Sequence, residues 1–198
     1  MANIQSYIEE LIEALTKLPG VGRKGAERIA YFIIHSDTST AKDLIASLNN
    51  INDELAICDD CGMIFLKKDN ECSCSLAANT KHICVVENIA DQWSIESTNI
   101  FSGYFHILGG TISGTINKSQ RLLVDSLVER VKKQNIEEVI VATSATVEGQ
   151  TTAYYIEETL KNTNVKISKL AQGLPVGGEI ESLDDGTLFS AFKNRVQI

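Results

Sequence analysis

The sequence predicts an α/β protein of 198 residues that is built from several consecutive modules. Three observations predict this fold class. Two amphipathic segments surround a glycine-rich turn near the start of the chain, four cysteines lie close together between residues 58 and 74, and from residue 82 onward short apolar segments alternate with amphipathic ones. Alternation of that kind is typical of a parallel sheet flanked by helices. A chain of this length can bury a sizeable hydrophobic core.

The N-terminal segment is predicted to form two helices joined by a hairpin. On each side of the hairpin apolar residues recur at three- and four-residue steps, which indicates one apolar face per helix. These residues are Ile4, Tyr7, Ile8, Leu11, Ile12 and Leu15 before the hairpin, and Ala26, Ile29, Ala30 and Ile33 after it. Between them Pro19 cannot continue the first helix, and Gly20 and Gly22 can adopt the positive φ angles of a tight turn.

A third helix is predicted to complete the helical module. Thr40 and Asp43 have the spacing of a capping box, in which each side chain accepts a hydrogen bond from the backbone N–H of the other residue. An apolar face follows them and consists of Leu44, Ile45, Leu48 and Ile51.

The hairpin has the chemistry of a phosphate-binding turn. The unpaired N–H groups and the dipole of the second helix favour an anion at its start, and positive side chains follow at once. The residues predicted to contact nucleic-acid backbone are Gly20, Gly22, Arg23, Lys24 and Arg28. The alternative is an ordinary turn between two core helices, with basic side chains that face solvent.

The overall charge limits how such a site can work. The net charge is −8 and the calculated pI is near 4.9, so nucleic acid has to meet a local basic patch on an acidic protein. Binding by one chain is expected to be weak and sensitive to salt. The sequence has no stretch as long as an apolar membrane span and no signal-peptide pattern at its start, so we expect a cytoplasmic protein without a membrane partner.

The cysteine cluster predicts a structural zinc site with one ion per chain. The expected ligands are Cys58, Cys61, Cys72 and Cys74, because four sulfur ligands select zinc over harder cations and leave no open position for a catalytic water. A single residue separates the second pair, so the fourth ligand is either Cys74 or His82. Free surface cysteines and a redox pair are the alternatives. Cys84 lies in an apolar run and is expected to be a buried core thiol.

The rest of the chain predicts a parallel sheet with helices between its strands. Strands are expected near 83–86, 104–108, 139–142 and 165–170, and helices near 89–97, 120–134 and 151–161. Ligands and partners of such sheets gather at the carboxyl ends of the strands. Four sites directly follow predicted strands: Glu87, Gly109–Gly110, the loop Thr143–Gln150 and the segment Gly173–Gly178.

Taken in order, these motifs resemble the RecR family of bacterial recombination mediators over nearly the whole chain. The resemblance rests on Leu-Pro-Gly-Val-Gly from Leu18, the cysteine cluster, Ile-Cys-Val-Val-Glu ending at Glu87, Thr-Val-Glu-Gly ending at Gly149, and Gly-Leu-Pro-Val-Gly-Gly from Gly173. Each motif is moderately specific alone, whereas the series is highly specific.

The resemblance implies four parts and a function without catalysis. The parts are a helix-hairpin-helix DNA-binding domain (1–54), a four-cysteine zinc finger element (55–78), a Toprim domain (79–172) and a C-terminal oligomerisation segment (173–198). Members of the family form dimers and ring-like tetramers that clamp single-stranded, gapped or double-stranded DNA and, with RecO and RecF, load recombinase. Lys24 and Arg28 match DNA-contacting positions of the family.

The sequence also departs from the family pattern. Arg23 replaces a usual proline, and Cys72-Ser73-Cys74 replaces a pair with a two-residue spacer. On the Toprim side, Ser144-Ala145, Gln150 and Gln172 replace an Asn-Pro, an acidic residue and an arginine. The acidic Toprim residues Glu87, Asp91 and Glu148 form a candidate partner surface that these changes would alter.

Two rival functions differ from a mediator. An active Toprim phosphoryl-transfer enzyme would hold Mg²⁺ with a glutamate and a closely spaced aspartate pair. Glu87 is present, but Thr143-Ser144-Ala145 provides no aspartate pair. A zinc-bearing adaptor that never contacts DNA is the second rival, if the hairpin is only structural. An ATPase is disfavoured because no phosphate-binding loop ends in Gly-Lys-Ser or Gly-Lys-Thr.

Overall fold

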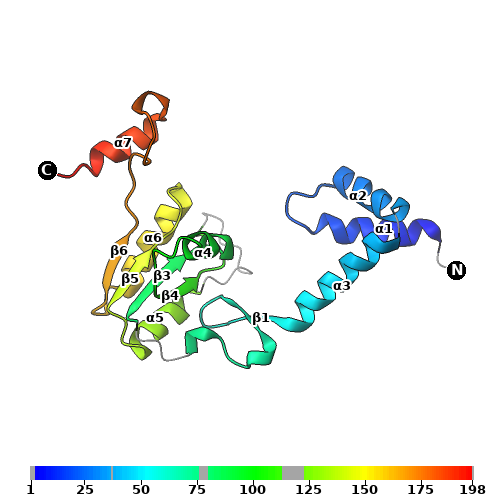
Figure 1. The fold of residues 1–198 in the computed structure, drawn as a ribbon, viewed down its shortest axis with the longest axis horizontal. Coiled ribbons are helices and arrows are strands. Elements are labelled where there is room, and N and C mark those ends of the chain that lie inside the picture. Colours follow the sequence, from blue (N-terminus) through cyan, green and yellow to red (C-terminus); the bar gives the residue numbers. More distant parts are fainter. Residues whose placement is uncertain (1–2, 37, 76–79, 113–122, 198) are drawn as a thin grey trace. The chain divides into compact units, whose positions relative to one another are not determined.

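The computed structural model describes residues 3–36, 38–75, 80–112 and 123–197. It divides into two compact units, Met1–Leu55 and Ala56–Ile198. Figure 1 shows an all-helical first unit, and a second unit in which helices surround a parallel sheet. The predicted α/β fold class is confirmed.

The first unit consists of the helices α1 (Ile4–Thr16), α2 (Arg23–His35) and α3 (Thr38–Glu54). Its buried core is small and lies between α1 and α2. Ile12, Ala26 and Ala30 are buried there, with four partly buried side chains around them: Ile8, Leu11, Leu15 and Val21. The two alanines have no bulk beyond Cβ, so the helices can approach closely.

The start of α3 differs from the prediction. The helix begins at Thr38, so Thr40 lies within its first turn, and the predicted capping box of Thr40 and Asp43 is wrong. The run Thr38-Ser39-Thr40 offers three residues that favour a helix start, and the spacing alone selected the last of them. The predicted apolar face of α3 is exposed, and no residue of the helix is buried among those described.

The cysteine loop opens the second unit. Two short strands, β1 (Leu55–Ile57) and β2 (Ile64–Leu66), pair on either side of the first two cysteines. Two single-turn helices follow, η1 (Lys67–Asp69) and η2 (Ser73–Ser75), and the second carries Cys74. The sequence did not predict this hairpin, because strands of three residues leave no measurable periodicity.

The sheet has four strands, all paired in parallel, in the order β4-β3-β5-β6. The strands are β3 (His82–Val86), β4 (Tyr104–Ile107), β5 (Glu138–Val141) and β6 (Lys166–Lys169). Four of the five β3 residues are buried, which is expected of a central strand that is covered on both faces.

Helices cover both faces of the sheet. Ile83 and Val85 of β3 share one core with residues of α5 (Val124–Lys133) and α6 (Val147–Leu160). The alternate residues Cys84 and Val86 share the other core with residues of α4 (Ile89–Glu96). Burial raises the pKa of the Cys84 thiol to about 11, as expected of the predicted core thiol.

One helix of this unit starts earlier than the sequence predicts. α6 begins at Val147, before its predicted start at Thr151, because the Thr146 hydroxyl accepts a hydrogen bond from the Gly149 N–H at 3.1 Å and caps the helix. The predicted helix 120–134 starts outside the described residues, and α5 is described from Val124.

The chain ends in η3 (Ile180–Ser182) and α7 (Asp185–Lys193). Asp184 caps α7 by accepting hydrogen bonds from the N–H and hydroxyl of Thr187, and the hydroxyl bond, followed by the N–H bond, lowers the pKa of this carboxyl. The Asn194 amide donates to the Gln172 carbonyl at 3.0 Å. No residue of α7 is buried.

Candidate nucleic-acid hairpin and metal centre

The hairpin between α1 and α2 is a tight turn with an open helix start. The Val21 N–H donates to the Leu18 carbonyl at 3.2 Å, and Gly20 takes a φ of 77°. A type II turn with proline as its second residue requires a positive φ at the third residue, so glycine is needed at position 20. Gly22 is the N-cap of α2 with an ordinary φ of −79°, and no side chain caps the helix. The first N–H groups of α2 are therefore available to a ligand.

Two of the three predicted basic side chains are unpaired. Lys24 and Arg28 are exposed, and neither forms an ion pair with any described carboxylate. They stand four residues apart, hence on the same face of α2. Both residues lie in the first two turns of α2, next to its uncapped start.

Arg23 behaves differently from its two neighbours. Its Nη2 lies 2.7 Å from Glu9 Oε1 on α1, and its Nε lies 3.4 Å from Glu27 Oε1. The hydrogen bond to Glu9 raises the pKa of the guanidinium above its usual value. Arg23 thus joins α1 to α2 across the turn, in place of the proline usual at this position.

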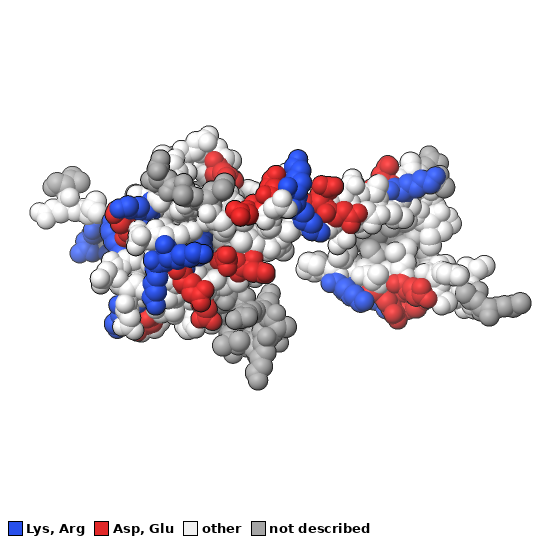
Figure 2. All heavy atoms as spheres, turned by 90° about the horizontal axis from the view of Figure 1, so that it is seen from below, with Lys and Arg blue, Asp and Glu red and all other residues white. Residues whose placement is uncertain are grey.

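The described surface carries mixed charges. In the view of Figure 2, blue Lys and Arg side chains lie next to red Asp and Glu side chains on both units. In this view the basic side chains form only local patches, which agrees with the acidic composition.

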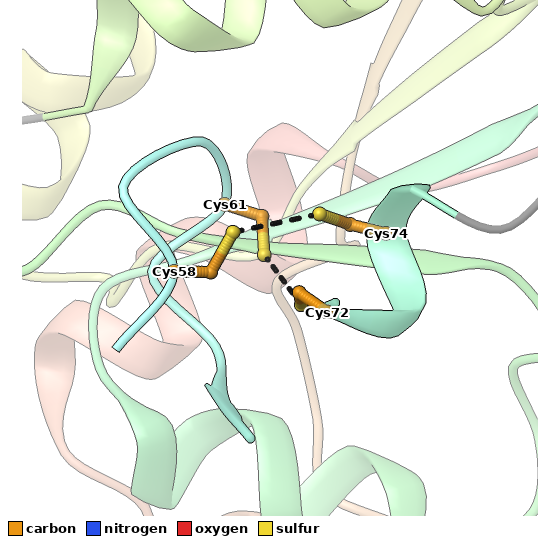
Figure 3. Close-up of side chains that lie close together, drawn as sticks. All are labelled: Cys58, Cys61, Cys72 and Cys74. Carbon is orange, nitrogen blue, oxygen red and sulfur yellow. Dashed lines mark hydrogen bonds between the residues drawn. The ribbon is translucent and has the colours of Figure 1, made fainter. Parts of the chain in front are cut away.

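The four predicted zinc ligands lie together in a buried cluster. Cys58 Sγ and Cys74 Sγ are 3.6 Å apart, and Cys61 Sγ and Cys72 Sγ are 3.5 Å apart (Figure 3). All four sulfurs lie within 4.8 Å of one another, and all four side chains are buried. Zinc bonded to four sulfurs at about 2.3 Å needs sulfur separations of about 3.8 Å in a tetrahedron. The cluster fits that ion.

His82, the other candidate for the fourth ligand, lies elsewhere. It begins β3, and its Nε2 is 3.9 Å from Glu138 Oε2. Cys74 therefore completes the described cluster, even though one residue separates it from Cys72.

The first cysteine pair sits on a backbone turn of its own. Cys58 donates its N–H to the Met63 carbonyl at 2.9 Å and accepts from the Gly62 N–H at 2.8 Å. Gly62, directly after Cys61, takes a φ of 73°, which favours glycine. Burial raises the pKa of Cys61 and raises that of Cys74 to about 11, and a bound cation would offset this effect by stabilising the thiolates.

The acidic Toprim residues are spread along one edge of the sheet. Glu87 Oε1 accepts a hydrogen bond from the Ser144 N–H at 2.7 Å, so this carboxylate fixes the loop after β5. Asp91 forms the capping box of α4 with Asn88. Glu148 is exposed in the first turn of α6. Among described residues, only the four cysteines gather three or more metal-ligating side chains.

The residues of the loop after β5 that differ from the family pattern form hydrogen bonds within that loop. The hydroxyls of Ser144 and Thr146 lie 2.7 Å apart, and the Gln150 amide donates to the Ala145 carbonyl at 2.9 Å. The loop is thus ordered by its own side chains.

Sequence reasoning missed one buried polar group. His106 lies on β4 and has no exposed surface. Its Nε2 lies 2.6 Å from the Leu123 carbonyl oxygen, and its Nδ1 lies 3.1 Å from Arg130 Nη1. Its position inside an apolar run of β4 is the only hint that the sequence offers.

Three family models match the chain: RecR helix-hairpin-helix over residues 8–51, a Toprim domain over 81–171, and RecR C-terminal over 173–196. No helix among the described residues is long and apolar enough to cross a bilayer.

Relatives match over almost their whole length. The recombination protein RecR of Pelagibacter ubique is 57% identical over 202 residues, which cover 100% of this chain and 98% of the relative. The corresponding proteins of Sphingopyxis alaskensis and Orientia tsutsugamushi (strain Boryong) are 38% and 36% identical, over 97% and 96% of this chain and 98% and 95% of their own. The predicted resemblance is confirmed, and the chain belongs to the RecR family of recombination proteins.

Proposed function

We propose that this chain is a non-catalytic DNA-binding mediator of recombinational repair that works in the cytoplasm. The observation that carries the proposal is the uncapped start of α2 with Lys24 and Arg28 exposed and unpaired beside it. Gly22 supports it, because neither its φ nor its surroundings require glycine and a Cβ there would meet nothing within 4 Å. A smooth backbone at this point lets a phosphate approach closely.

In this proposal several chains assemble into a dimer and then a tetrameric ring around DNA. The support is the large amount of apolar surface that each terminal segment leaves exposed. The exposed apolar side chains are Leu44, Ile45, Leu48 and Ile51 on α3, and Leu174, Val176, Ile180, Phe189, Phe192 and Val196 near the C-terminus. Contiguous apolar patches mark interaction sites. A ring also brings several weak hairpins to one DNA molecule, which raises avidity.

The proposal extends to partners and to the metal. RecO and RecF would be the proteins with which the assembly loads recombinase, as in the family, and the edge that holds Glu87, Asp91 and Glu148 would be the surface they meet. The cysteine cluster would hold one structural zinc per chain. Four thiolates would close its coordination shell and leave no position for a substrate.

Removal of the two free charges tests DNA binding. Lys24→Ala with Arg28→Ala should weaken binding to single-stranded DNA roughly ten-fold at low salt and reduce the slope of log K against log [salt] by about 1.4 for each engaged hairpin. Fluorescence anisotropy across a salt series measures both quantities.

The matched control removes the same charge from the other unit. Lys132→Ala with Lys169→Ala changes two exposed lysines of the α/β unit, neither ion-paired with a described carboxylate, and should leave the slope almost unchanged. Equal slopes for both double variants would contradict the hairpin as the DNA site and would favour the adaptor.

A further inference from the structure

The two cysteine pairs of the metal centre are supported in different ways. Cys58 and Cys61 lie on a turn closed by two backbone hydrogen bonds, described above. The second pair has only one intervening residue. Among the described residues one carbonyl bond closes its backbone, from the Ser75 N–H to the Cys72 carbonyl at 2.9 Å, and the Cys74 N–H donates to the Cys72 thiol. The shorter pair therefore has less local structure to fix its sulfurs.

Each pair is also connected to the α/β body through the carbonyl of its second cysteine. The Ile107 N–H at the end of β4 donates to the Cys61 carbonyl at 2.7 Å. For the other pair the donor is a side chain, because the Gln134 Nε2 donates to the Cys74 carbonyl at 2.6 Å. The carbonyl of Cys74 can only accept, so this contact requires the NH₂ group of the amide.

Gln134 is well placed to act as a fixed support. It is the C-cap of α5, and its backbone N–H donates to the Arg130 carbonyl at 2.9 Å. In the same helix Leu127 and Val131 are buried in the core of the sheet, so the end of α5 cannot shift freely.

We propose that Gln134 is a positioning residue for the metal centre: it holds Cys74 in the coordination shell and replaces the support that the shorter second pair lacks. The inference rests on the proposed zinc site. Gln134 touches the backbone of a ligand and not the ion, so its role is to orient the sulfur. Loss of such outer contacts typically weakens metal binding 10- to 100-fold.

Two substitutions distinguish the effect of the hydrogen bond from the effect of side-chain packing. Gln134→Glu keeps the size of the side chain but removes the donor, so a carboxylate oxygen faces the Cys74 carbonyl. Gln134→Ala removes the donor and the side chain together. Gln150→Ala is the matched control, since Gln150 at the start of α6 also donates its amide to a backbone carbonyl, that of Ala145, at 2.9 Å.

The experiment uses the full chain loaded with zinc. Zinc content is first measured by elemental analysis, and zinc affinity then by competition with a chromophoric chelator. The cobalt-substituted proteins are compared by the visible absorption of the Co²⁺–thiolate centre, which reports the geometry of the shell. We expect both Gln134 variants to bind zinc 10- to 100-fold more weakly than wild type and to show altered cobalt spectra, with the control within about two-fold.

The outcomes are distinguishable. Wild-type affinity and spectrum in Gln134→Glu, or equal weakening in Gln150→Ala, would overturn the positioning role and leave the zinc site intact. A wild-type chain that binds no zinc at all would overturn both the metal centre and this inference.

Discussion

His106 is a buried histidine whose protonation state follows from its two neighbours. The Leu123 carbonyl can only accept a hydrogen bond, so Nε2 must carry the proton, and the Arg130 guanidinium can only donate, so Nδ1 must be the acceptor. The ring is neutral. Burial, and then the charge of Arg130, lower its pKa from 6.5 to about 4. Arg130 is held in turn by the Phe105 carbonyl at 3.1 Å and lies 5.6 Å from the centre of the Tyr104 ring.

This residue predicts a specific loss of stability in acid. Below pH 6.5 the unfolded chain binds a proton at His106 that the folded chain excludes until about pH 4, so stability falls as the pH falls through that range. The loss reaches roughly 3 kcal/mol by pH 4. His106→Gln provides both a hydrogen-bond donor and an acceptor without titrating, so the unfolding free energy of the variant should fall less steeply between pH 6.5 and 4. Urea titrations at several pH values measure the difference, and parallel curves for the two proteins would refute the assignment.

The turn of the first cysteine pair illustrates how one element is fitted to another. A Cβ at Gly62 would lie 2.3 Å from the Ile107 carbonyl oxygen, so the turn touches the backbone at the end of β4. The bond from the Ile107 N–H to the Cys61 carbonyl fixes the same contact. Glycine is required here for two reasons, its φ of 73° and the closeness of the strand.

Substitution of this glycine tests the fit of the two elements. Gly62→Ala should lower the unfolding free energy by the cost of a positive φ, about 1 to 2 kcal/mol, plus the cost of the backbone clash. Gly109→Ala is the control, because Gly109 has a φ of 85° but nothing within 4 Å of its position, so it incurs only the first cost. Denaturant unfolding should show a larger loss of unfolding free energy for Gly62→Ala than for Gly109→Ala. Equal losses would mean that the turn does not contact the backbone of β4.

At the scale of the whole molecule, both terminal segments carry apolar side chains that no described part of the chain covers. Phe189 and Phe192 of α7 are 71% and 70% exposed, and the four apolar side chains of α3 are between 46% and 63% exposed. The small buried core of the first unit contains only three residues of α1 and α2. Assembly would remove this surface from water, which favours association at about 25 cal/mol per Å² of apolar area.

The α7 aromatics should therefore control the size of the assembly. Phe189→Ser with Phe192→Ser is expected to reduce the mass in solution by at least half at micromolar concentration, as measured by sedimentation velocity. Trp93→Ser with Tyr154→Ser is the control, because these aromatics are similarly exposed, at 58% and 63%, outside the terminal segments. An unchanged mass in the α7 variant, or a wild-type monomer, would contradict assembly through this segment.

Much of this architecture could be predicted from local patterns. Alternating strands and helices predict the parallel sheet, and the spacing of Cys58 and Cys61 predicts the turn on which they lie. Pro19 and Gly20 predict the hairpin, because their conformational limits act on the chain itself.

What the sequence could not predict depends on contacts between distant residues. The Arg23–Glu9 pair joins residues 14 positions apart and exists only because α1 and α2 pack side by side. Gln134 and Cys74 are 60 positions apart, and His106 and Arg130 are 24 apart. Neither composition nor periodicity records such pairs, since both describe neighbours along the chain.

The strand order also determines when each strand can pair while the chain is being synthesised. The helical hairpin and the cysteine loop need only contacts that are close in sequence, whereas β3 must wait for β5, which begins at Glu138, before its second edge is paired. At synthesis rates of about 5–20 residues per second, that wait lasts roughly 3 to 10 s. During this interval β3, the most apolar strand of the sheet, has at least one unpaired edge, and the exposed apolar side chains of α3 have already been synthesised. The growing chain is thus most exposed to aggregation in the middle of its synthesis, before the C-terminal segment exists.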